Sequence, residues 1–535
     1  MLPGHVRVPK DFAARYRAAG WWEGRTLGDV FMEAFKSHGD REALVGGSER
    51  VTYSELAERS RNVAAGLQRR GLRPLDRVVV HLPNSLEFAY AYIGLQLIGA
   101  IPVMALPAHR RSEIEHFVNL GGARAYLHAG RLGDLDTAAL AADLQQTHPS
   151  LEVALTQAEV TAMAATPGTF ERRFIDPADP AVLLLSGGTT GLPKLIPRTH
   201  EDYLHNSLCA GAVNDIRPDD SLLVVLPLGH NFPLACPGLQ AFLLAGARVV
   251  LGDGSGAGAN LALVAREGVT HLELVPAVLI RWLEDPALAG HDLRRLRIVN
   301  TGGQRLQPEV KRRALDLLAG AQVQEVFGMA EGLLCFNRLD DPPEVAIETT
   351  GRPVSPGDEV RIVDGDGNDV APGVIGELLC RGPYTIRGYF QAPEHNAKAF
   401  TADGFYRSGD LVRMHPSGNL VVEGRSKDLI NRGGEKISAE EIEDLALRHP
   451  AIINIACVPM PDRVLGERIC AFVVLRPGST MTLDDLTIHL LGLGIARFKL
   501  PERLEVLAEL PITRIGKVSK KDLVEMVRRR GRDTG

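Results

Sequence analysis

The chain has 535 residues, of which 45% are hydrophobic and 24% are charged, as in an ordinary soluble globular protein. At roughly 100–200 residues per domain, its length predicts two to four domains or subdomains. A net charge of −6 argues against a global basic field that would recruit nucleic acid. The six cysteines form no CxxC pair, which argues against a zinc site and a disulfide framework. The N-terminal segment lacks the apolar core of a secretory signal, so we expect a cytoplasmic protein.

Residues 88–107, FAYAYIGLQLIGAIPVMALP, form a long and nearly uncharged stretch that could be taken for a membrane helix. Pro102 and two glycines interrupt the stretch, and β-branched residues follow them. A buried helix that leads into a buried strand fits this pattern better, so we expect no membrane partner.

Between residues 50 and 330, short apolar runs alternate with helical patterns. The runs predicted as strands are residues 77–82, 181–186, 221–227, 247–252, 271–276 and 297–302. Continuous apolar strands separated by helices predict an α/β fold with doubly wound parallel sheets. Such sheets bind ligands at the carboxyl ends of their strands. The loops after 181–185, at 301–303 and at 327–332 are therefore expected to meet at one ligand.

After about residue 355 the pattern changes. Residues 358–382 alternate and turn often, which predicts a small antiparallel β unit. A predicted helix at 438–450 is followed by strands at 453–460 and 468–478 and by two more helical patterns. The polar, glycine-containing segment 424–436 is typical of a hinge. We therefore predict a large N-terminal domain, residues 1–426, and a smaller mobile α+β domain, residues 427–535.

The segment 186–194, SGGTTGLPK, has the composition of a phosphate-binding loop. A Walker P-loop places its lysine directly after the last glycine, and a serine or threonine follows. Here Leu192 and Pro193 separate Gly191 from Lys194, and Leu195 occupies the hydroxyl position. The spacing excludes a Walker NTPase. Glycine N–H groups, hydroxyls and one lysine still suit an oxyanion.

The loop resembles the phosphate loop of the adenylate-forming (ANL) superfamily, and further motifs occur in the superfamily's order. FGMAEG (327–332) resembles the motif with the magnesium-binding glutamate, although Ala330 replaces the usual threonine. YRSGD (406–410) resembles the ribose-binding motif. GRSKDLINRGGEKISAEEIE (424–443) resembles the hinge motif, and PITRIGKVSKK (511–521) resembles the segment with the catalytic lysine. The similarity runs from about residue 20 to residue 525.

This resemblance implies ATP and Mg²⁺ as cofactors and assigns roles to individual residues. The implied catalytic residues are Lys517, Glu331, which also binds the metal, and His230. The implied ATP- and AMP-binding residues are Ser186, Gly187, Gly188, Thr189, Thr190, Gly191, Lys194, Gly302, Gly303, Phe327, Gly328, Asp410 and Arg425. By the same resemblance, Lys427 is the hinge and Gly434 lines a tunnel for a thiol.

LPLGHNFPLACPG (226–238) resembles the aryl acid–AMP ligases of the superfamily, those of siderophore-type biosynthesis, which activate salicylate or 2,3-dihydroxybenzoate. The resemblance places Asn231 at a 2-hydroxyl of the ring and His230 beside the carboxylate. The implied substrate-binding residues are His230, Asn231, Phe232, Cys236, Gly303, Gly328 and Leu334. In this family, 2,3-dihydroxybenzoate ligases tend to have serine and valine where this chain has Cys236 and Leu334. A weakly hydrogen-bonding thiol and a larger side chain favour salicylate, unless both residues are ordinary apolar packing.

The implied reaction joins the aryl acid to AMP, releases pyrophosphate and passes the acyl group to a thiol. The expected acceptor is the phosphopantetheine arm of an aryl carrier protein on a separate chain. An aryl-CoA ligase that uses free CoA is the alternative enzyme. A non-catalytic nucleotide-binding homologue is the remaining alternative, although Lys517 and Glu331 are both present. Arg305, in the segment GGQRL, has no role in this scheme.

Overall fold

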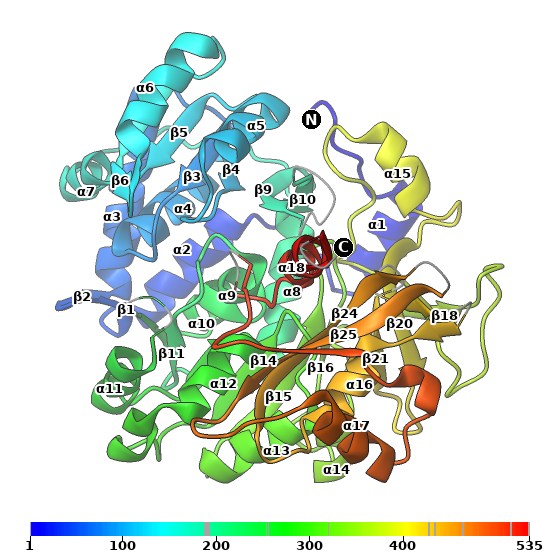
Figure 1. Cartoon of the computed structure of the whole chain (residues 1–535). Coiled ribbons are helices and arrows are strands. Elements are labelled where there is room, and N and C mark those ends of the chain that lie inside the picture. The colour runs from blue at the N-terminus through cyan, green and yellow to red at the C-terminus, as the bar shows by residue number, and fades with distance from the viewer. Residues whose placement is uncertain are drawn as a thin grey trace.

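The computed structural model describes residues 2–186, 193–252, 254, 256–318, 320–425, 429–432, 435–462, 465–513 and 516–532. For residues 425, 431, 435, 436 and 530–532 it describes the backbone alone. Within these ranges the strands form sheets of nine, six, four and five strands and one two-stranded ribbon. Helices cover the two larger sheets (Figure 1), so the predicted α/β class is confirmed.

The nine-stranded sheet has the order β17-β16-β15-β14-β13-β11-β12-β1-β2. Its strands are β1 (Glu42–Gly46), β2 (Glu49–Thr52), β11 (Ser221–Val224), β12 (Arg248–Leu251), β13 (His271–Leu274), β14 (Ile298–Gly302), β15 (Gln322–Gly328), β16 (Leu334–Phe336) and β17 (Arg352–Pro353). The strands from β15 to β1 run parallel, and the outer strands at both edges run antiparallel. The predicted strands at 221–227, 247–252, 271–276 and 297–302 all lie in the parallel part.

The six-stranded sheet has the order β10-β9-β4-β3-β5-β8. Its strands are β3 (Arg77–His81), β4 (Ile101–Met104), β5 (Ala125–His128), β8 (Val153–Thr156), β9 (Pro180–Leu185) and β10 (Leu195–Thr199), and the ribbon pairs β6 (Arg131–Leu132) with β7 (Leu135–Asp136). The stretch 88–107 lies mainly in α4 and β4 and is largely buried, as predicted. Of the helices in the described part of the chain, none combines the length and the hydropathy that a membrane-spanning segment needs.

The helices of the N-terminal part pack on and between these two sheets. They are α1 (Lys10–Ala18), α2 (Leu27–His38), α3 (Tyr53–Arg69), α4 (Leu86–Ile98), α5 (Arg111–Gly121), α6 (Thr137–Thr147), α7 (Gln157–Ala165), α8 (His200–Val213), α9 (Asn231–Ala235), α10 (Gly238–Leu244), α11 (Ala257–Glu267), α12 (Pro276–Glu284), α13 (Pro308–Leu317), α14 (Pro343–Glu348) and α15 (Pro393–Ala399). Helix α2 contacts α3, α4, α8 and α10, and the buried residues of these helices belong to one apolar core. That core holds the strand ends of both sheets in fixed positions.

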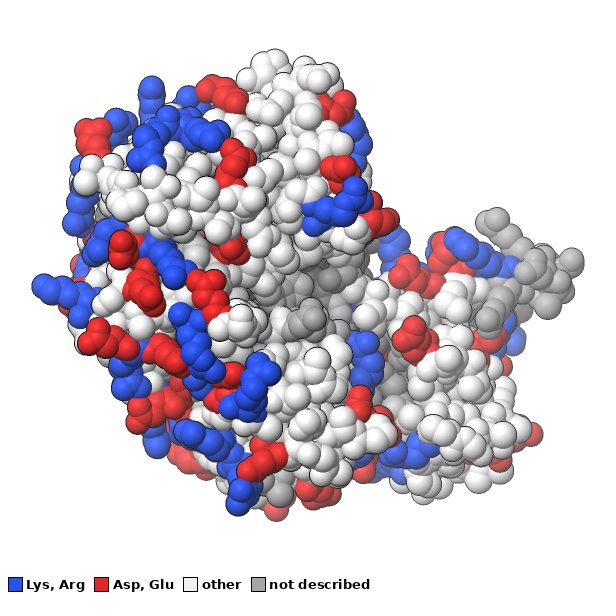
Figure 2. Space-filling view, turned by 90° about the vertical axis from the view of Figure 1, so that its left-hand side faces the viewer, with Lys and Arg blue, Asp and Glu red and all other residues white. Residues whose placement is uncertain are grey.

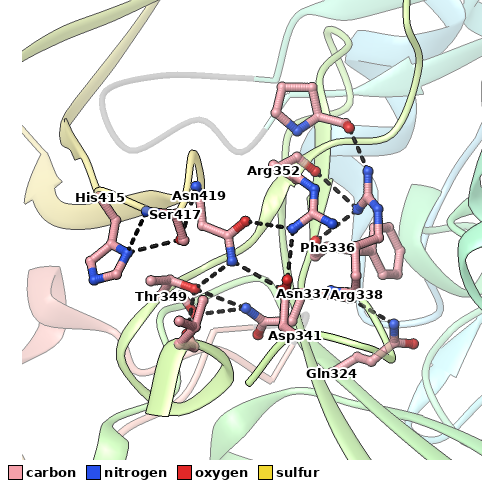
Figure 3. A network of polar contacts seen from close by, with 12 residues as sticks. Gln324, Phe336, Asn337, Arg338, Asp341, Thr349, Arg352, His415, Ser417 and Asn419 are labelled. Atoms are coloured by element: carbon pink, nitrogen blue, oxygen red, sulfur yellow. Dashed lines mark hydrogen bonds and ion pairs between the residues drawn. The ribbon is translucent and has the colours of Figure 1, made fainter. Parts of the chain in front are cut away.

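The predicted small β unit is an antiparallel four-stranded sheet. Its strands are β18 (Glu359–Val363), β19 (Gly376–Arg381), β20 (Tyr406–Met414) and β21 (Leu420–Arg425). A polar network attaches this sheet to the edge of the nine-stranded sheet (Figure 3). Asn419, in the turn between β20 and β21, donates to Asp341 at 3.0 Å and to Thr349 at 2.9 Å, and Arg352 of β17 donates to Asn419 at 3.0 Å.

The C-terminal part is an α+β unit, as predicted. Its strands are β22 (Ile430–Arg432), β23 (Glu435–Ile437), β24 (Ile452–Asp462), β25 (Gly466–Leu475) and β26 (Arg503–Val506), and its helices are α16 (Ala439–Ala446), α17 (Leu483–Gly492) and α18 (Lys520–Arg532). Figure 1 shows these orange-to-red elements on the side of the molecule where β14 and β15 lie. Residues 426–428 lie outside the described residues, so the boundary between 426 and 427 stays a prediction.

A second view shows how charge is distributed on one face of the molecule. Basic and acidic side chains are interspersed over this face, and a notch separates the large body from a smaller lobe on the side of the C-terminal unit (Figure 2). The described residues of this face therefore form no continuous basic field of the kind that binds a nucleic acid backbone.

Candidate active site

The ends of the predicted phosphate loop meet at the end of β9. The Ser186 N–H donates to the Lys194 carbonyl at 3.0 Å, and the Lys194 N–H donates to the Ser186 hydroxyl at 2.9 Å. These two bonds close the loop at its base, directly after the buried strand. The predicted phosphate ligands Gly187, Gly188, Thr189, Thr190 and Gly191 lie outside the described residues.

Tyr389 connects the predicted pyrophosphate lysine with the predicted metal ligand. Its hydroxyl donates to Glu331 Oε1 at 2.7 Å, and the Lys194 ammonium lies 5.8 Å from the centroid of its ring. The Tyr406 hydroxyl lies 2.9 Å from the Tyr389 hydroxyl. Burial, followed by the charge of Glu331, raises the pKa of Tyr389 above its usual value, so the phenol remains a donor. Sequence reasoning missed Tyr389, since an isolated aromatic residue in RGYF carries no motif.

The surroundings of Glu331 are compatible with Mg²⁺. The side chain is buried, and its second carboxylate oxygen can serve as a hard ligand. Among the described residues, no group of three or more His, Cys, Asp or Glu side chains could form a metal cage. One carboxylate with room for substrate phosphates is a common arrangement for Mg²⁺ in nucleotide enzymes.

Asp410, the predicted ribose ligand, lies in the middle of β20 and is buried. It pairs with Arg425 across the ladder between β20 and β21, so these two predicted ribose contacts are neighbours in the backbone. Burial, followed by the charge of Glu331, raises the pKa of Tyr406, and the charge of Asp410 also contributes. The carboxylates of Glu331, the predicted metal ligand, and Asp410, the predicted ribose ligand, therefore both lie near the Tyr406 hydroxyl.

Lys517 lies over the loop that follows β14. A Cβ atom at Gly303 would lie 2.9 Å from Lys517 Cε, and Gly303 has a φ of +89°, which favours glycine. At Gly302, a Cβ atom would lie 2.8 Å from the Val326 carbonyl oxygen. The backbone of the neighbouring strand thus requires glycine at position 302, whereas at position 303 the positive φ favours glycine and an added Cβ would displace the Lys517 side chain.

His230 is the N-cap of the short helix α9, and its Nδ1 accepts from the Phe232 N–H at 3.2 Å. Burial, and then the positive charge of Lys517, lower the pKa of His230 from 6.5 to about 3. The ring is therefore neutral at physiological pH. Because Nδ1 accepts a hydrogen bond, the ring proton is on Nε2, and His230 offers a single N–H donor.

Asn231 has a fixed orientation. Its Oδ1 accepts from the Tyr203 hydroxyl at 2.7 Å, and its Nδ2 donates to Cys236 Sγ at 3.3 Å. Asn206 Nδ2 lies 3.6 Å from the same sulfur. A hydrogen bond therefore joins the side chains of two predicted specificity residues, Asn231 and Cys236. Tyr203 was not predicted, because it lies in α8 and meets Asn231 of α9 only in the folded chain.

The remaining predicted pocket residues form an apolar wall. The Phe232 ring lies 3.5 Å from the position of a Cβ on Gly302, and Leu334 Cδ2 lies 2.5 Å from that of a Cβ on Gly328. Leu334 and Gly328 face each other across the ladder between β15 and β16, one residue along from Phe327. Any side chain at position 328 would need the space that Leu334 fills.

Two buried ionisable residues near this region were not predicted. The Arg198 guanidinium donates to the Ala330 carbonyl at 3.1 Å and to Asp202 at 2.8 Å, and thereby fixes the loop of Glu331 to α8. Glu273, in β13, accepts from the Gly238 N–H at 2.8 Å, and burial raises its pKa to about 8. Lys427 and Gly434, the predicted hinge and tunnel residues, lie outside the described residues.

The family comparisons agree with this geometry. The AMP-binding enzyme family matches residues 31–390, and the AMP-binding enzyme C-terminal domain matches residues 441–517. The chain belongs to the AMP-binding enzyme family. It is similar to a salicylyl-CoA synthase / salicylate adenylyltransferase of a Streptomyces species, with 48% identity over 98% of both chains.

Two further curated relatives have similar lengths. A salicyl-AMP ligase / salicyl-S-ArCP synthetase of Mycobacterium tuberculosis is 44% identical, over 98% of this chain and 95% of that protein. A 2,3-dihydroxybenzoate-AMP ligase of Bacillus subtilis is 42% identical over 98% of both chains. The names of these two relatives include salicylate and 2,3-dihydroxybenzoate, the two acids expected from the sequence.

Solved structures share the whole fold. The apo structure of MbtA from Mycobacterium smegmatis is 43% identical, with a TM-score of 0.75 over 98% of both chains. MatB from Rhodopseudomonas palustris is 27% identical and gives a TM-score of 0.84 in its ATP-bound structure but 0.76 in its apo structure. The chain therefore superposes more closely on the ATP-bound MatB structure than on the apo structure.

Proposed function

We propose that the protein activates an aryl carboxylic acid with ATP, forming aryl-AMP and pyrophosphate, and that salicylate is its preferred acid. The observation that carries this proposal is the orientation of Asn231. Since Tyr203 donates to its oxygen and its nitrogen donates to Cys236, the second hydrogen of that nitrogen can meet the oxygen of a 2-hydroxyl group.

The preference for salicylate over 2,3-dihydroxybenzoate rests on Cys236 and Leu334. The Cys236 sulfur already accepts from Asn231, so it is a poor partner for a 3-hydroxyl group. Leu334 is buried and fills the space beside Gly328. A 3-hydroxyl group desolvated without a partner costs about 1–3 kcal/mol. The names of the relatives include both acids, so the ring pocket of this chain has to supply the discrimination.

In the proposed first step, a carboxylate oxygen attacks the α-phosphorus and the bond to the β-phosphate oxygen breaks. Pyrophosphate leaves with that electron pair. Lys517 stabilises negative charge on the carboxylate and the transferring phosphate, while Lys194 and its loop hold the leaving group. Neutral His230 donates through Nε2–H to the carboxylate. Glu331 would hold Mg²⁺, which neutralises phosphate charge when bound.

In the proposed second step, a thiol sulfur attacks the acyl carbon, the acyl–phosphate bond breaks and AMP leaves, while the thiol proton passes to solvent. We favour the phosphopantetheine arm of a separate aryl carrier protein as the thiol, in line with the relative named salicyl-S-ArCP synthetase. Free CoA is the second candidate, because another relative is named salicylyl-CoA synthase.

ATP–pyrophosphate exchange with salicylate, 2,3-dihydroxybenzoate and benzoate tests the first step. We expect exchange to be fastest with salicylate and slowest with benzoate, which lacks the 2-hydroxyl group. Faster exchange with 2,3-dihydroxybenzoate would overturn the preference, and no exchange with any of the three would overturn the proposed function. Thioester formation with CoA, compared with a phosphopantetheinylated aryl carrier protein, separates the two acceptors.

A further inference from the structure

Two consecutive residues after β14, Gln304 and Arg305, contact the C-terminal unit. Gln304 Oε1 accepts from the backbone N–H of Val518 at 2.9 Å. Val518 directly follows Lys517, so this bond holds the backbone of the lysine segment against the large body. The Lys517 N–H in turn donates to the Thr513 hydroxyl at 3.1 Å, which closes the turn that carries the lysine.

Arg305 forms the second contact. Its Nη1 lies 2.8 Å from Asp444 Oδ2, with side-chain exposures of 12% and 16%. Asp444 belongs to α16, where Glu443 is already paired with Lys520 at 2.9 Å. Burial opposes the charged form of Arg305, but the charge of Asp444, followed by that of Glu325, raises its pKa above the usual value. Arg305 is therefore a cation of the large body that faces an acidic helix of the C-terminal unit.

The junction between the two units combines polar and apolar groups, since Pro276, Ala277 and Ile455 line it together with Arg305 and Asp444. A narrow cavity of about 50 Å³ adjoins Arg305, Asp444 and Val518, and it is large enough for water. A second ion pair, between Arg476 and Glu284 at 3.0 Å, crosses the same junction and is more exposed. Ion pairs beside water can break and re-form, because water replaces the partner of each charged group.

We propose that Gln304 is a positioning residue for Lys517, and that the Arg305–Asp444 pair is a latch that favours the orientation in which Lys517 reaches the acyl-adenylate site. Both contacts exist only while the C-terminal unit lies against β14. The inference rests on the proposed function for its two half-reactions.

Gln304→Ala tests the positioning role. We expect the kcat for adenylation to fall about tenfold, the size of one lost hydrogen bond, with little change in the KM for the aryl acid. Release of AMP from preformed salicyl-AMP, with pantetheine as the thiol, should stay unchanged. Equal losses in both half-reactions would indicate a general structural defect and overturn the proposal, as would unchanged adenylation.

Charge reversal tests the latch. Arg305→Asp and Asp444→Arg should each slow adenylation about fivefold or more relative to thiol transfer, and the double variant should recover most of the loss. Arg297→Ala is the matched control, because Arg297 forms a half-buried 2.7 Å ion pair with Asp220 inside the large body. It should lower stability without changing the ratio of the two rates. No recovery in the double variant would overturn the latch.

A distance measurement that needs no substrate tests the latch even if the protein does not activate an aryl acid. Spin labels on cysteines introduced at the exposed residues Asp219 and Asp484, in a Cys209→Ser background, report the distance between the two units. The parent protein should give one dominant distance. Arg305→Asp should broaden or shift that distribution, and Arg297→Ala should not. An unchanged distribution in Arg305→Asp would refute the latch, whatever acid the protein activates.

Discussion

The Tyr389 hydroxyl donates to the Glu331 carboxylate at 2.7 Å, and the ring of the same tyrosine faces the Lys194 ammonium. One phenol thus orients the proposed metal ligand and lies beside the proposed pyrophosphate lysine. Removing only the hydroxyl leaves the ring in place and separates these two effects.

Tyr389→Phe should reduce ATP–pyrophosphate exchange about tenfold and raise the Mg²⁺ concentration needed for half-maximal rate, because Glu331 loses a charge-assisted hydrogen bond. Tyr126→Phe is the control, since the buried Tyr126 hydroxyl lies 2.8 Å from His81 in the six-stranded sheet. That variant should lose stability and keep its Mg²⁺ dependence. The same Mg²⁺ dependence in Tyr389→Phe and the parent would contradict the role of the tyrosine.

Gly303→Ala should abolish most adenylation, by about 100-fold or more, because its Cβ would approach Lys517 Cε to 2.9 Å. Thiol transfer from preformed salicyl-AMP should be affected much less. Gly130→Ala has a similar φ of +83° with no atom within 4 Å of the added Cβ, so it reproduces the backbone penalty alone. Equal activity of the two variants would contradict the close approach of Lys517.

Cys236→Ser combined with Leu334→Val should shift the ratio of kcat/KM for salicylate and 2,3-dihydroxybenzoate by about 10–200-fold toward the latter. The serine supplies a hydroxyl partner, and the valine vacates space beside Gly328. Cys335→Ser is the matched control, because Cys335 is fully buried and adjoins Leu334 in β16. It should cost stability without altering the ratio. No shift in the double variant would mean that both residues are ordinary packing.

Glu273→Gln should stabilise the protein, and more at pH 8 than at pH 5. Burial raises the pKa of Glu273 from 4.5 to about 8. Between these values the folded state keeps a proton that the unfolded state has lost, so the contribution of Glu273 to stability falls as pH rises. Glutamine keeps an acceptor for the Gly238 N–H and does not titrate. Urea unfolding at both pH values measures the effect, and equal gains would contradict the raised pKa.

The sequence was sufficient to predict those features of the fold and the site that local residue patterns indicate. The apolar runs that became β11 to β14 and the glycine-rich segments at their ends are local signals, so the sheets and the position of the site could be anticipated. The partners of Arg305 and Tyr389 could not, because Asp444 and Glu331 are distant in the chain and meet them only after the units have packed. The burial of Glu273 could not be predicted either, because a single acidic residue in an apolar run is typical of the exposed end of a strand.

The hydrogen bonds of Asn419 to Asp341 and Thr349 have a consequence for the order of events in catalysis. They attach β20, and with it the proposed ribose ligand Asp410, to the large body and not to the unit that carries Lys517. In the proposed two-step reaction, a rotation of the smaller unit would leave the ribose contact of Asp410 in place on the large body. The proposed aryl-AMP is a mixed anhydride that water would readily hydrolyse. A ribose contact that does not move can retain it between the two half-reactions, while the residues around the acyl group change.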